Sequence, residues 1–499
     1  MKNFYFRTNL GKKIGIGNYM RVYRIASLLK KQGHVCTIFV DYFLKNFNFD
    51  SNVSIKFLYS GPEKISEIDD ANLFIYQTPR KGIVILDDYR LKEKWQTKVK
   101  SHHNKLVVID DFLNSSHATD ILINSKPIFL NEKSVNLIKA KNPNTKLLLG
   151  PKYCIIDKKI EKNKKLKKKF KIVFYIGGGG DLLPIYNILN YLISLNRSNF
   201  NNFHIYVVVG SLATNKEKIL ILSKKFKNIE AIYSQNEIYK KINHSNLFVG
   251  SAGISIFETA LYKIPTILFK TSNNQEVDLD SLEKIGHYLL LNLKDLYKYK
   301  QITKLILLIH KKFSSFKEIF KSSNFSLDDK GCERIVSEIL GNKKKIKTKY
   351  NKKKEKLKTK KDKYSVSKIN TKYVNKYLLS RNLKMNRINS INSEKIDNLN
   401  HYLWWFNNKR MSYIFRKNNN DIIFFYHEII KIKNLSFIKP GWCLIDNKVL
   451  FLDILRALKI QEKIINRQNY PIPNLGIIKK DNVSMIKFAK NLNWEKIHS

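Results

Sequence analysis

Cysteine is scarce in this 499-residue chain, and the few cysteines are widely spaced. No two of them form a Cys-x-x-Cys pair, and they stand at Cys36, Cys154, Cys332 and Cys443. This spacing argues against a disulfide framework and against a zinc site, and it is typical of reduced thiols in a cytosol. We therefore expect neither a disulfide nor a bound metal.

Long apolar stretches are also missing. The N-terminus, MKNFYFRTNLGKKIGIGN, lacks the apolar core of a signal peptide. No apolar run has the length that a membrane-spanning helix needs. From these two absences we expect a cytoplasmic protein without a membrane span.

Acidic side chains are few, because 41 Asp and Glu stand against 92 Lys and Arg, for a net charge of +51. Such a charge attracts nucleic acids, membrane surfaces and small anions. However, lysine, asparagine and isoleucine are abundant everywhere, and the lysines lack the aromatic interleaving of nucleic-acid surfaces. Two alternative explanations of the charge remain: a compositional bias and a basic binding surface. We expect no nucleic-acid partner, although the positive charge of the protein would attract an anionic ligand such as a nucleoside diphosphate.

Residues 1–157 contain short apolar runs separated by loops and one clear helical pattern. The first run, 3–7, is followed by a glycine-rich loop, a helix over 20–29 and a strand over 35–41. Further strands are expected at 71–76, 82–89, 105–112 and 119–124. Short runs that are apolar on both faces are typical of a parallel sheet, so this part predicts a doubly wound Rossmann-type lobe.

Residues 158–341 predict a second lobe of the same kind. After a lysine-dense connection, strand and helix patterns alternate from 171 to 269. Residues 342–369 predict a lysine-rich linker, with 13 lysines between 343 and 363. Residues 370–499, with mixed strand and helix patterns, predict a third, α+β module.

Four consecutive glycines at 177–180 stand between a strand and a helix in the second lobe. Glycines here, Gly178 among them, let the backbone approach a charged ligand closely, and the helix behind them favours an anion. The same pattern also occurs in ordinary tight turns.

The segment GSAGISIFETALYKIP at 250–265 gives a stronger indication of a ligand site. Gly253 and Ser255 are small residues at a helix start, where unpaired N–H groups suit a diphosphate. Glu258 follows one turn later and could accept both ribose hydroxyls, or merely complement the helix dipole. Asn274 and Gln275 follow a strand end, a position typical of ligand contacts and equally of turns.

In their order and spacing, these blocks resemble a family of hydrolases in pseudaminic acid biosynthesis. These enzymes release UDP from UDP-2,4-diacetamido-2,4,6-trideoxy-β-L-altropyranose and look like GT-B glycosyltransferases, especially the MurG type. The similar segments, within residues 3–300, are R-x-N-x(5)-G-x-G-N-x-x-R, L-D-D-Y-x-L-x(3)-W, V-I-D-D-F, H-A-T-D-I-L-I-N, L-G-P-K-Y, the glycine run, G-S-A-G-x-S-x-x-E-T and N-N-Q. The resemblance implies a GT-B fold without a cofactor and a UDP-sugar substrate.

The resemblance also implies that water displaces UDP at the anomeric carbon with inversion. In the family, a histidine that follows the first glycine loop, G-x-G-H, is the general base. Here Gly15 and Gly17 are followed by Asn18, and the family's R-x-D has become R-x-N at Asn9. A neutral amide cannot accept a proton near neutral pH, whereas a histidine can.

Tyr89 matches the tyrosine of the family's D-x-Y motif and could position the attacking water. Asp88 and Asp111 are alternative bases if they face the ligand. Arg21 and Arg7 could reach phosphate or carbonyl groups of the substrate, or simply pair with carboxylates. Of the two we favour Arg21 for a substrate contact, because it begins the helix that faces the glycine loop. His117 and Asp120 also match the family, and we expect them to be scaffolding.

The last segment, GIIKKDNVSMIKFAKNLNWEKI at 476–497, resembles the end of the GNAT N-acetyltransferases. The resemblance implies that Asn482 lies near the thiol of acetyl-CoA, with Ser484 and Phe488 in the same register. Residues 404–429 fit the family's helix and hairpin. After an expected strand at 447–453, however, the sequence has no glycine with which to bind the CoA pyrophosphate. Acetyl-CoA is thus a possible cofactor of this module only.

Four hypotheses remain open. The leading one is a nucleotide-sugar hydrolase fused to an acetyltransferase-like module. The alternatives are a GT-B glycosyltransferase, a catalytically silent UDP-sugar-binding scaffold, and a basic surface-binding protein.

Overall fold

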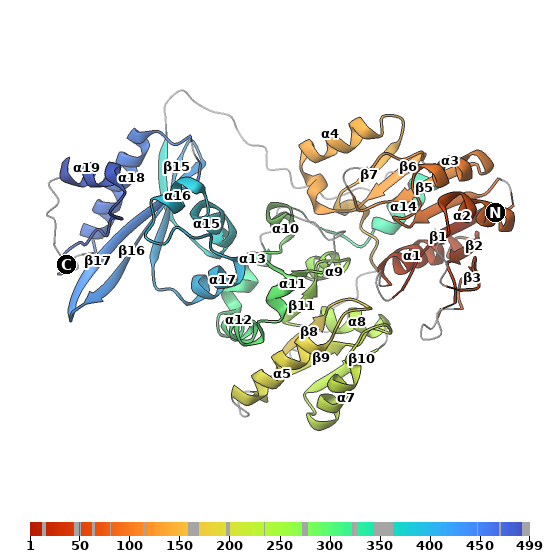
Figure 1. The fold of residues 1–499 in the computed structure, drawn as a ribbon, viewed down its shortest axis with the longest axis horizontal. Helices are drawn as coiled ribbons and strands as arrows, with labels where there is room; N and C mark the ends of the chain where they lie inside the picture. The colour runs from red at the N-terminus through yellow and green to blue at the C-terminus, as the bar shows by residue number, and fades with distance from the viewer. Residues whose placement is uncertain are drawn as a thin grey trace. The chain divides into compact units, whose positions relative to one another are not determined.

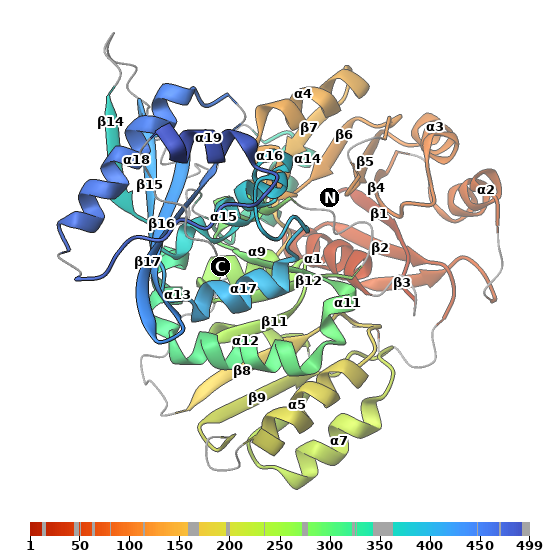
Figure 2. The same cartoon turned by 60° about the vertical axis from the view of Figure 1, so that its left-hand side comes forward.

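The computed structural model describes most of the chain (Figures 1 and 2). The described residues are 1–11, 16–43, 49, 51–61, 65–79, 81–112, 115–157, 169–195, 200–233, 235–271, 278–321, 325, 327–342, 363–446, 448–468 and 471–491. They divide into two compact units, one of residues 1–303 with 312–352 and one of residues 304–311 with 353–499.

The first lobe contains a parallel sheet of seven strands in the order β3-β2-β1-β4-β5-β6-β7. The strands are β1 (Asn3–Thr8), β2 (Val35–Val40), β3 (Ser54–Phe57), β4 (Ile83–Asp87), β5 (Lys105–Ile109), β6 (Ile121–Asn124) and β7 (Lys146–Leu149). The direction of winding reverses between β1 and β4. Loops at such a switch point diverge beyond the carboxyl ends of the strands and leave room for a ligand.

Helices cover both faces of this sheet. They are α1 (Gly17–Lys31), α2 (Glu67–Gln77), α3 (Glu93–His102), α4 (Glu132–Lys141) and α14 (Gly331–Leu340), with short 3₁₀ turns η1 (Pro127–Leu130) and η2 (Pro151–Tyr153). One apolar core contains buried side chains of α1 and α14, and another contains those of α2, α3 and α4. The last helix of the predicted second lobe thus packs in the core of the first.

The predicted strand at 71–76 is wrong, because these residues belong to helix α2. Ser66 caps this helix by accepting a hydrogen bond from the Asp69 backbone N–H at 3.2 Å. Ala71 and Phe74 face the core, whereas Tyr76 is 90% exposed. The apolar run alone suggested a strand, and the serine cap before it was the missed signal for a helix.

The second lobe repeats the same topology with six parallel strands in the order β10-β9-β8-β11-β12-β13. These are β8 (Phe170–Tyr175), β9 (Phe203–Val208), β10 (Ile229–Ile232), β11 (Leu247–Ser251), β12 (Thr266–Lys270) and β13 (Leu289–Asn292). Its helices are α5 (Leu183–Leu195), α7 (Lys216–Lys225), α8 (Gln235–Asn243), α9 (Ser255–Tyr262), α10 (Leu279–Ile285), α11 (Leu293–Leu296), α12 (Tyr299–Lys311) and α13 (Phe313–Lys321). The predicted pair of doubly wound lobes is confirmed, and the second switch point lies between β8 and β11.

The C-terminal module is an α+β unit with an antiparallel sheet in the order β14-β15-β16-β17. Its elements are β14 (Tyr364–Lys368), η4 (Thr371–Tyr373), α15 (Val374–Arg381), α16 (Lys384–Ile388), α17 (Asn398–Asn407), β15 (Met411–Lys417), β16 (Asn420–Ile432), β17 (Leu435–Leu444), α18 (Phe451–Asn466) and α19 (Val483–Asn491). The predicted helix and hairpin at 404–429 correspond to α17, β15 and β16.

Two boundaries differ from the sequence-based expectations. Strand β14 lies inside the predicted linker 342–369, because its alternating Tyr364 and Val366 pack against the core of the module. The strand expected at 447–453 is wrong, since β17 ends at Leu444 and helix α18 begins at Phe451. In α18, buried residues recur every four positions, at Ala457, Gln461 and Ile465, and this spacing is typical of a helix.

Within the part of the chain that the structure describes, no helix is both long and apolar enough to cross a membrane.

Candidate functional site

Polar residues gather at the carboxyl edge of both sheets, at the two switch points. In the first lobe they follow β1, β4 and β5, and in the second lobe they follow β8 and β11. Helix α1 of the first lobe contributes side chains to both edges: Arg21 to the first-lobe edge and Arg24 to the second-lobe edge.

Arg21 organises the first-lobe edge. Its guanidinium binds Asp87 through two hydrogen bonds, Nε to Oδ2 at 2.8 Å and Nη2 to Oδ1 at 2.7 Å. Nη1 donates to Asp111 Oδ2 at 2.8 Å, and Nη2 also donates to Tyr89 Oη at 2.8 Å and Asn18 Oδ1 at 3.2 Å. Arg21 is thus held by protein carboxylates, and the expected direct contact with substrate competes with these bonds.

Asn18 is buried, and both ends of its amide are used within the same network. Its Oδ1 accepts from Arg21, while its Nδ2 donates to the Asp87 carbonyl at 3.3 Å and to Asn9 Oδ1 at 3.4 Å. Asn9 in turn donates to Asp88 Oδ1 at 2.9 Å. Asn18 therefore positions Arg21 and cannot take a proton from water.

The two carboxylates bound to Arg21 differ in protonation. Burial raises the pKa of Asp87 to about 7, although Arg21 opposes the shift. Burial also disfavours the charge on Asp111, but Arg21, Lys126 and a hydrogen bond from Tyr89 outweigh it and lower the pKa of Asp111. Asp111 is therefore ionised at neutral pH.

Tyr89 links Arg21 to Asp111, because its hydroxyl accepts from Arg21 and donates to Asp111 Oδ2. Burial raises the pKa of Tyr89 well above its usual range. The phenol stays protonated and serves as a donor that fixes the carboxylate. Among the described residues, Asp111 Oδ1 has no hydrogen-bond partner, so it is the oxygen of this network available to a ligand.

Arg7 has a structural role, as its complete burial indicates. It donates to Asp70 at 2.5 and 3.1 Å and to Asp41 at 2.6 Å. Trp95 Nε1 donates to the same Asp70 carboxylate at 2.8 Å. Asp88 is likewise occupied, by Asn9 and by the side chain of Arg90 at 2.5 and 3.0 Å.

His117 and Asp120 contact only scaffold groups in the hydrogen bonds of the described residues. The His117 ring lies 3.3 Å from Asp110 Oδ2 and 3.2 Å from Gln96 Nε2. Asp120 accepts from the Leu106 backbone N–H at 2.8 Å.

The glycine run brings the second lobe against the first. Gly177 has a φ of +96°, a conformation that other residues rarely adopt. A Cβ atom on Gly178 would lie only 2.7 Å from Ile16 Cγ1, at the start of α1. Gly178 thus permits close contact between the lobes, whereas a Cβ on Gly17 would meet open space.

The start of α9 forms the other part of the second-lobe edge. Gly253 precedes the helix and is partly exposed, and Ser255 is buried, with its hydroxyl donating to the Ser251 carbonyl at 3.1 Å. Glu258 is 6% exposed, and burial raises its pKa to about 7 despite the nearby Arg24. Gly15, Asn274 and Gln275 lie outside the described residues.

Arg24 is a site residue that sequence reasoning missed. Its Nη2 donates to Glu258 Oε1 at 3.1 Å and to Asp157 Oδ2 at 3.0 Å, while Nη1 donates to the Ile155 carbonyl at 2.9 Å. The available signal was its spacing of three residues from Arg21, which places both arginines on neighbouring positions of α1.

In the C-terminal module, Asn482 directly precedes α19 and caps it. Its Oδ1 accepts a hydrogen bond from the Met485 backbone N–H at 3.1 Å. The side chains of Ser484 and Phe488 lie outside the described ones.

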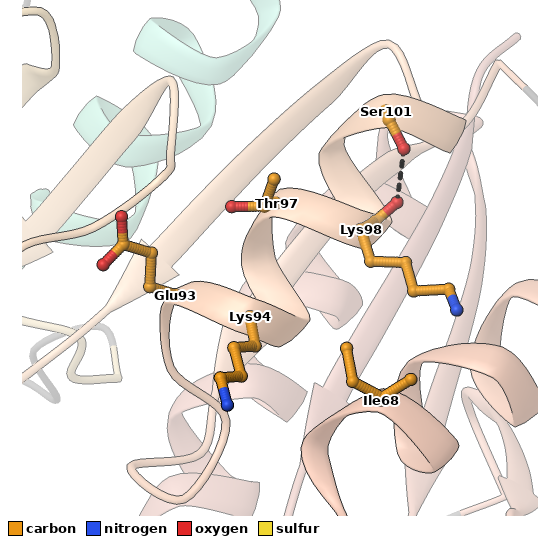
Figure 3. A pocket seen from close by; sticks show the side chains of 6 residues that line it. All are labelled: Ile68, Glu93, Lys94, Thr97, Lys98 and Ser101. Carbon is orange, nitrogen blue, oxygen red and sulfur yellow. Dashed lines mark hydrogen bonds between the residues drawn. The ribbon is translucent and has the colours of Figure 1, made fainter.

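A surface hollow of about 490 Å³ lies elsewhere, on the first lobe (Figure 3). It is lined by residues of α2 and α3, namely Ile68, Glu93, Lys94, Thr97, Lys98 and Ser101. None of the predicted site residues borders it, so we place the candidate site at the switch points. Among the described residues, no group of three or more His, Cys, Asp or Glu side chains is arranged to hold a metal ion.

No family model matches the chain, and no curated protein matches it in sequence. Several solved structures are similar in fold. The S. aureus MnaA–UDP complex has 12% identity and a TM-score of 0.44, covering 68% of this chain and 96% of the other. A UDP-N-acetylglucosamine 2-epimerase has 10% identity and a TM-score of 0.45, with 70% and 98% covered. Acinetobacter baumannii MurG has 9% identity and a TM-score of 0.40, with 68% and 99% covered. At such identities, what the site of this chain does rests on its own residues.

Proposed function

We propose that residues 1–341 hydrolyse a UDP-linked diacetamido-trideoxyhexose at its anomeric carbon. The observation that carries this proposal is the paired arrangement at the two switch points. An ionised carboxylate, Asp111, is fixed at one of them, and a second carboxylate, Glu258, lies in the first turn of α9 at the other. The sequence blocks similar to UDP-sugar hydrolases lie around these same two edges.

In the proposed reaction, the ribose binds Glu258 and the diphosphate lies at the start of α9, where backbone N–H groups favour an anion. Water attacks the anomeric carbon, the bond from that carbon to the phosphate oxygen breaks, and UDP leaves with the electron pair. The proton of the water passes to the Asp111 carboxylate. Arg21 and Tyr89 hold this carboxylate in place.

The test is the release of UDP from the diacetamido sugar nucleotide without an acceptor, measured by chromatography. Asp111→Asn should lower the rate by about 10²- to 10⁴-fold, the usual contribution of a general base. Asp41→Asn is the matched control. Asp41 is also paired with arginines at this sheet edge, but its partners are Arg7 and Arg90 and not Arg21. An Asp111→Asn variant with the full rate would contradict the proposed base.

A glycosyltransferase is the second candidate, and the amide at Asn18 favours it. This position lacks the base that activates water in the similar hydrolases, so an acceptor hydroxyl could take the place of water. UDP release only in the presence of an acceptor would support transfer over hydrolysis. UDP binding without release from any donor would instead support a scaffold.

We further propose that the C-terminal module is an acetyltransferase-like domain. The order of a strand, three helices, an antiparallel three-stranded meander and a helix supports this proposal, as does a parallel bridge between Ile438 and Asn474 beside β17. Two features differ from the GNAT pattern described above for the sequence. The segment 445–450, after β17, contains no glycine that could approach a pyrophosphate, and the side chain of Asn482 caps a helix. Titration of acetyl-CoA into the full chain by calorimetry tests the proposal, and an absence of heat would contradict it.

A further inference from the structure

One buried guanidinium joins the first lobe, the segment that leaves it, and the second lobe. Arg24 lies on α1, and its partners Ile155 and Asp157 lie just after the first lobe's last 3₁₀ turn. Its third partner, Glu258, lies on α9 of the second lobe. Arg24 is 8% exposed and Glu258 is 6% exposed, so this contact is shielded from water.

The contact leaves half of the Glu258 carboxylate available. Arg24 binds Oε1, and among the described residues Oε2 accepts no hydrogen bond. A carboxylate oxygen has two lone pairs, so Oε1 can also accept a further donor. The carboxylate is therefore oriented by one cation and still able to accept two hydroxyl groups.

We propose that Arg24 is a positioning residue for nucleotide recognition: from the first lobe it orients the Glu258 carboxylate of the second lobe toward the ribose hydroxyls. The inference rests on the proposed function, because it assumes that the ligand is a ribonucleotide. It adds a residue of the opposite lobe to the ribose site, so that nucleotide recognition depends on both lobes.

The charges around Glu258 explain why a cation is needed there. Asp157 repels a negative charge on Glu258, and burial favours the neutral acid, whereas Arg24 favours the carboxylate. Without Arg24, Glu258 would be protonated over a wider pH range and would lose an accepting oxygen. It would then discriminate poorly between a sugar with two hydroxyls and a sugar with one.

Calorimetric titrations of the full chain with UDP and with 2′-deoxy-UDP test this role. The wild type should bind UDP about tenfold more tightly, the usual contribution of one hydrogen bond to a charged group. Arg24→Gln should lose most of this preference, as should Glu258→Ala, and the double variant should show no further loss. Arg24→Lys keeps the charge and should retain part of the preference.

Arg334→Gln is the matched control. Arg334 is also a buried arginine, and it also donates to a backbone carbonyl, that of Lys152 in the first lobe's last 3₁₀ turn, at 2.9 Å. Its carboxylate partner, however, is Asp328 at 2.5 and 2.7 Å. The control should keep the full preference for UDP over 2′-deoxy-UDP.

Equal losses of affinity for both nucleotides in Arg24→Gln would overturn the inference, because a merely structural arginine acts on both ligands alike. If Arg24→Gln does not fold, an unchanged preference in Arg24→Lys combined with a lost preference in Glu258→Ala would overturn it too. A wild-type chain that binds neither nucleotide would refute the proposed function itself. A chain that binds UDP without an Arg24 effect would refute the inference alone.

Discussion

Two buried carboxylates, Asp87 at the end of β4 in the first lobe and Glu258 in the first turn of α9 in the second, are held differently. Burial raises the pKa of both Asp87 and Glu258 to about 7. Asp87 receives two hydrogen bonds from Arg21 of its own lobe, whereas Glu258 receives one from Arg24 of the other lobe. The carboxylate at the first-lobe edge is thus held by an arginine of its own lobe, whereas the carboxylate at the second-lobe edge is held by an arginine of the opposite lobe.

The largest expected effect concerns the stability of these two pairs. Arg21→Gln removes the guanidinium that pairs with both Asp87 and Asp111, and breaking a buried ion pair in this way costs about 3–5 kcal/mol. Arg24→Gln should cost less, because Asp157, one of its acidic partners, is half exposed. Urea unfolding measures the free energy of unfolding of both variants relative to the wild type. An equal decrease in both variants would contradict the expected difference between the two arginines.

The pH dependence of stability isolates Glu258. Its pKa is about 7 in the folded chain and near 4.5 when unfolded, so between these values the folded chain binds the extra proton. The free energy of unfolding of the wild type, relative to Glu258→Gln, should therefore fall by up to about 3 kcal/mol as the pH rises from about 5 to 8. Other titrating groups are common to both proteins and cancel. A difference that does not change with pH would contradict the raised pKa.

A smaller effect is expected from the chemistry at the first-lobe edge. Asn18→His replaces an amide by a group that can accept a proton, and it should raise UDP release by about tenfold or more, mostly above pH 6.5. Asn18→Gln is the control, because it changes the size of the side chain without adding a base. No change, or a loss, would mean that water is not activated at this position.

Much of the fold could be predicted from the sequence, because short apolar runs that are buried on both faces mark parallel strands. The strands expected at 82–89, 105–112 and 119–124 are confirmed as β4, β5 and β6. Strands β3 and β7 were missed, since both are short and partly exposed at the edges of the sheet.

The candidate site could be predicted only where it is local in sequence. Asn18, Tyr89 and Glu258 lie in recognisable motifs, but their partners come from distant segments. The pairing of Arg24 with Glu258 joins residues 234 positions apart. Periodicity predicts which face of a helix is buried, but it does not predict which distant charge that face will meet.

The most direct test of the two-lobed nucleotide site is a crystal structure of the full chain with UDP. The expected result has the ribose hydroxyls on Glu258, with Arg24 still bound to this carboxylate, and the diphosphate beside Gly253 and Ser255. UDP bound away from α9, or bound at α9 with Glu258 turned away from the ribose, would contradict it.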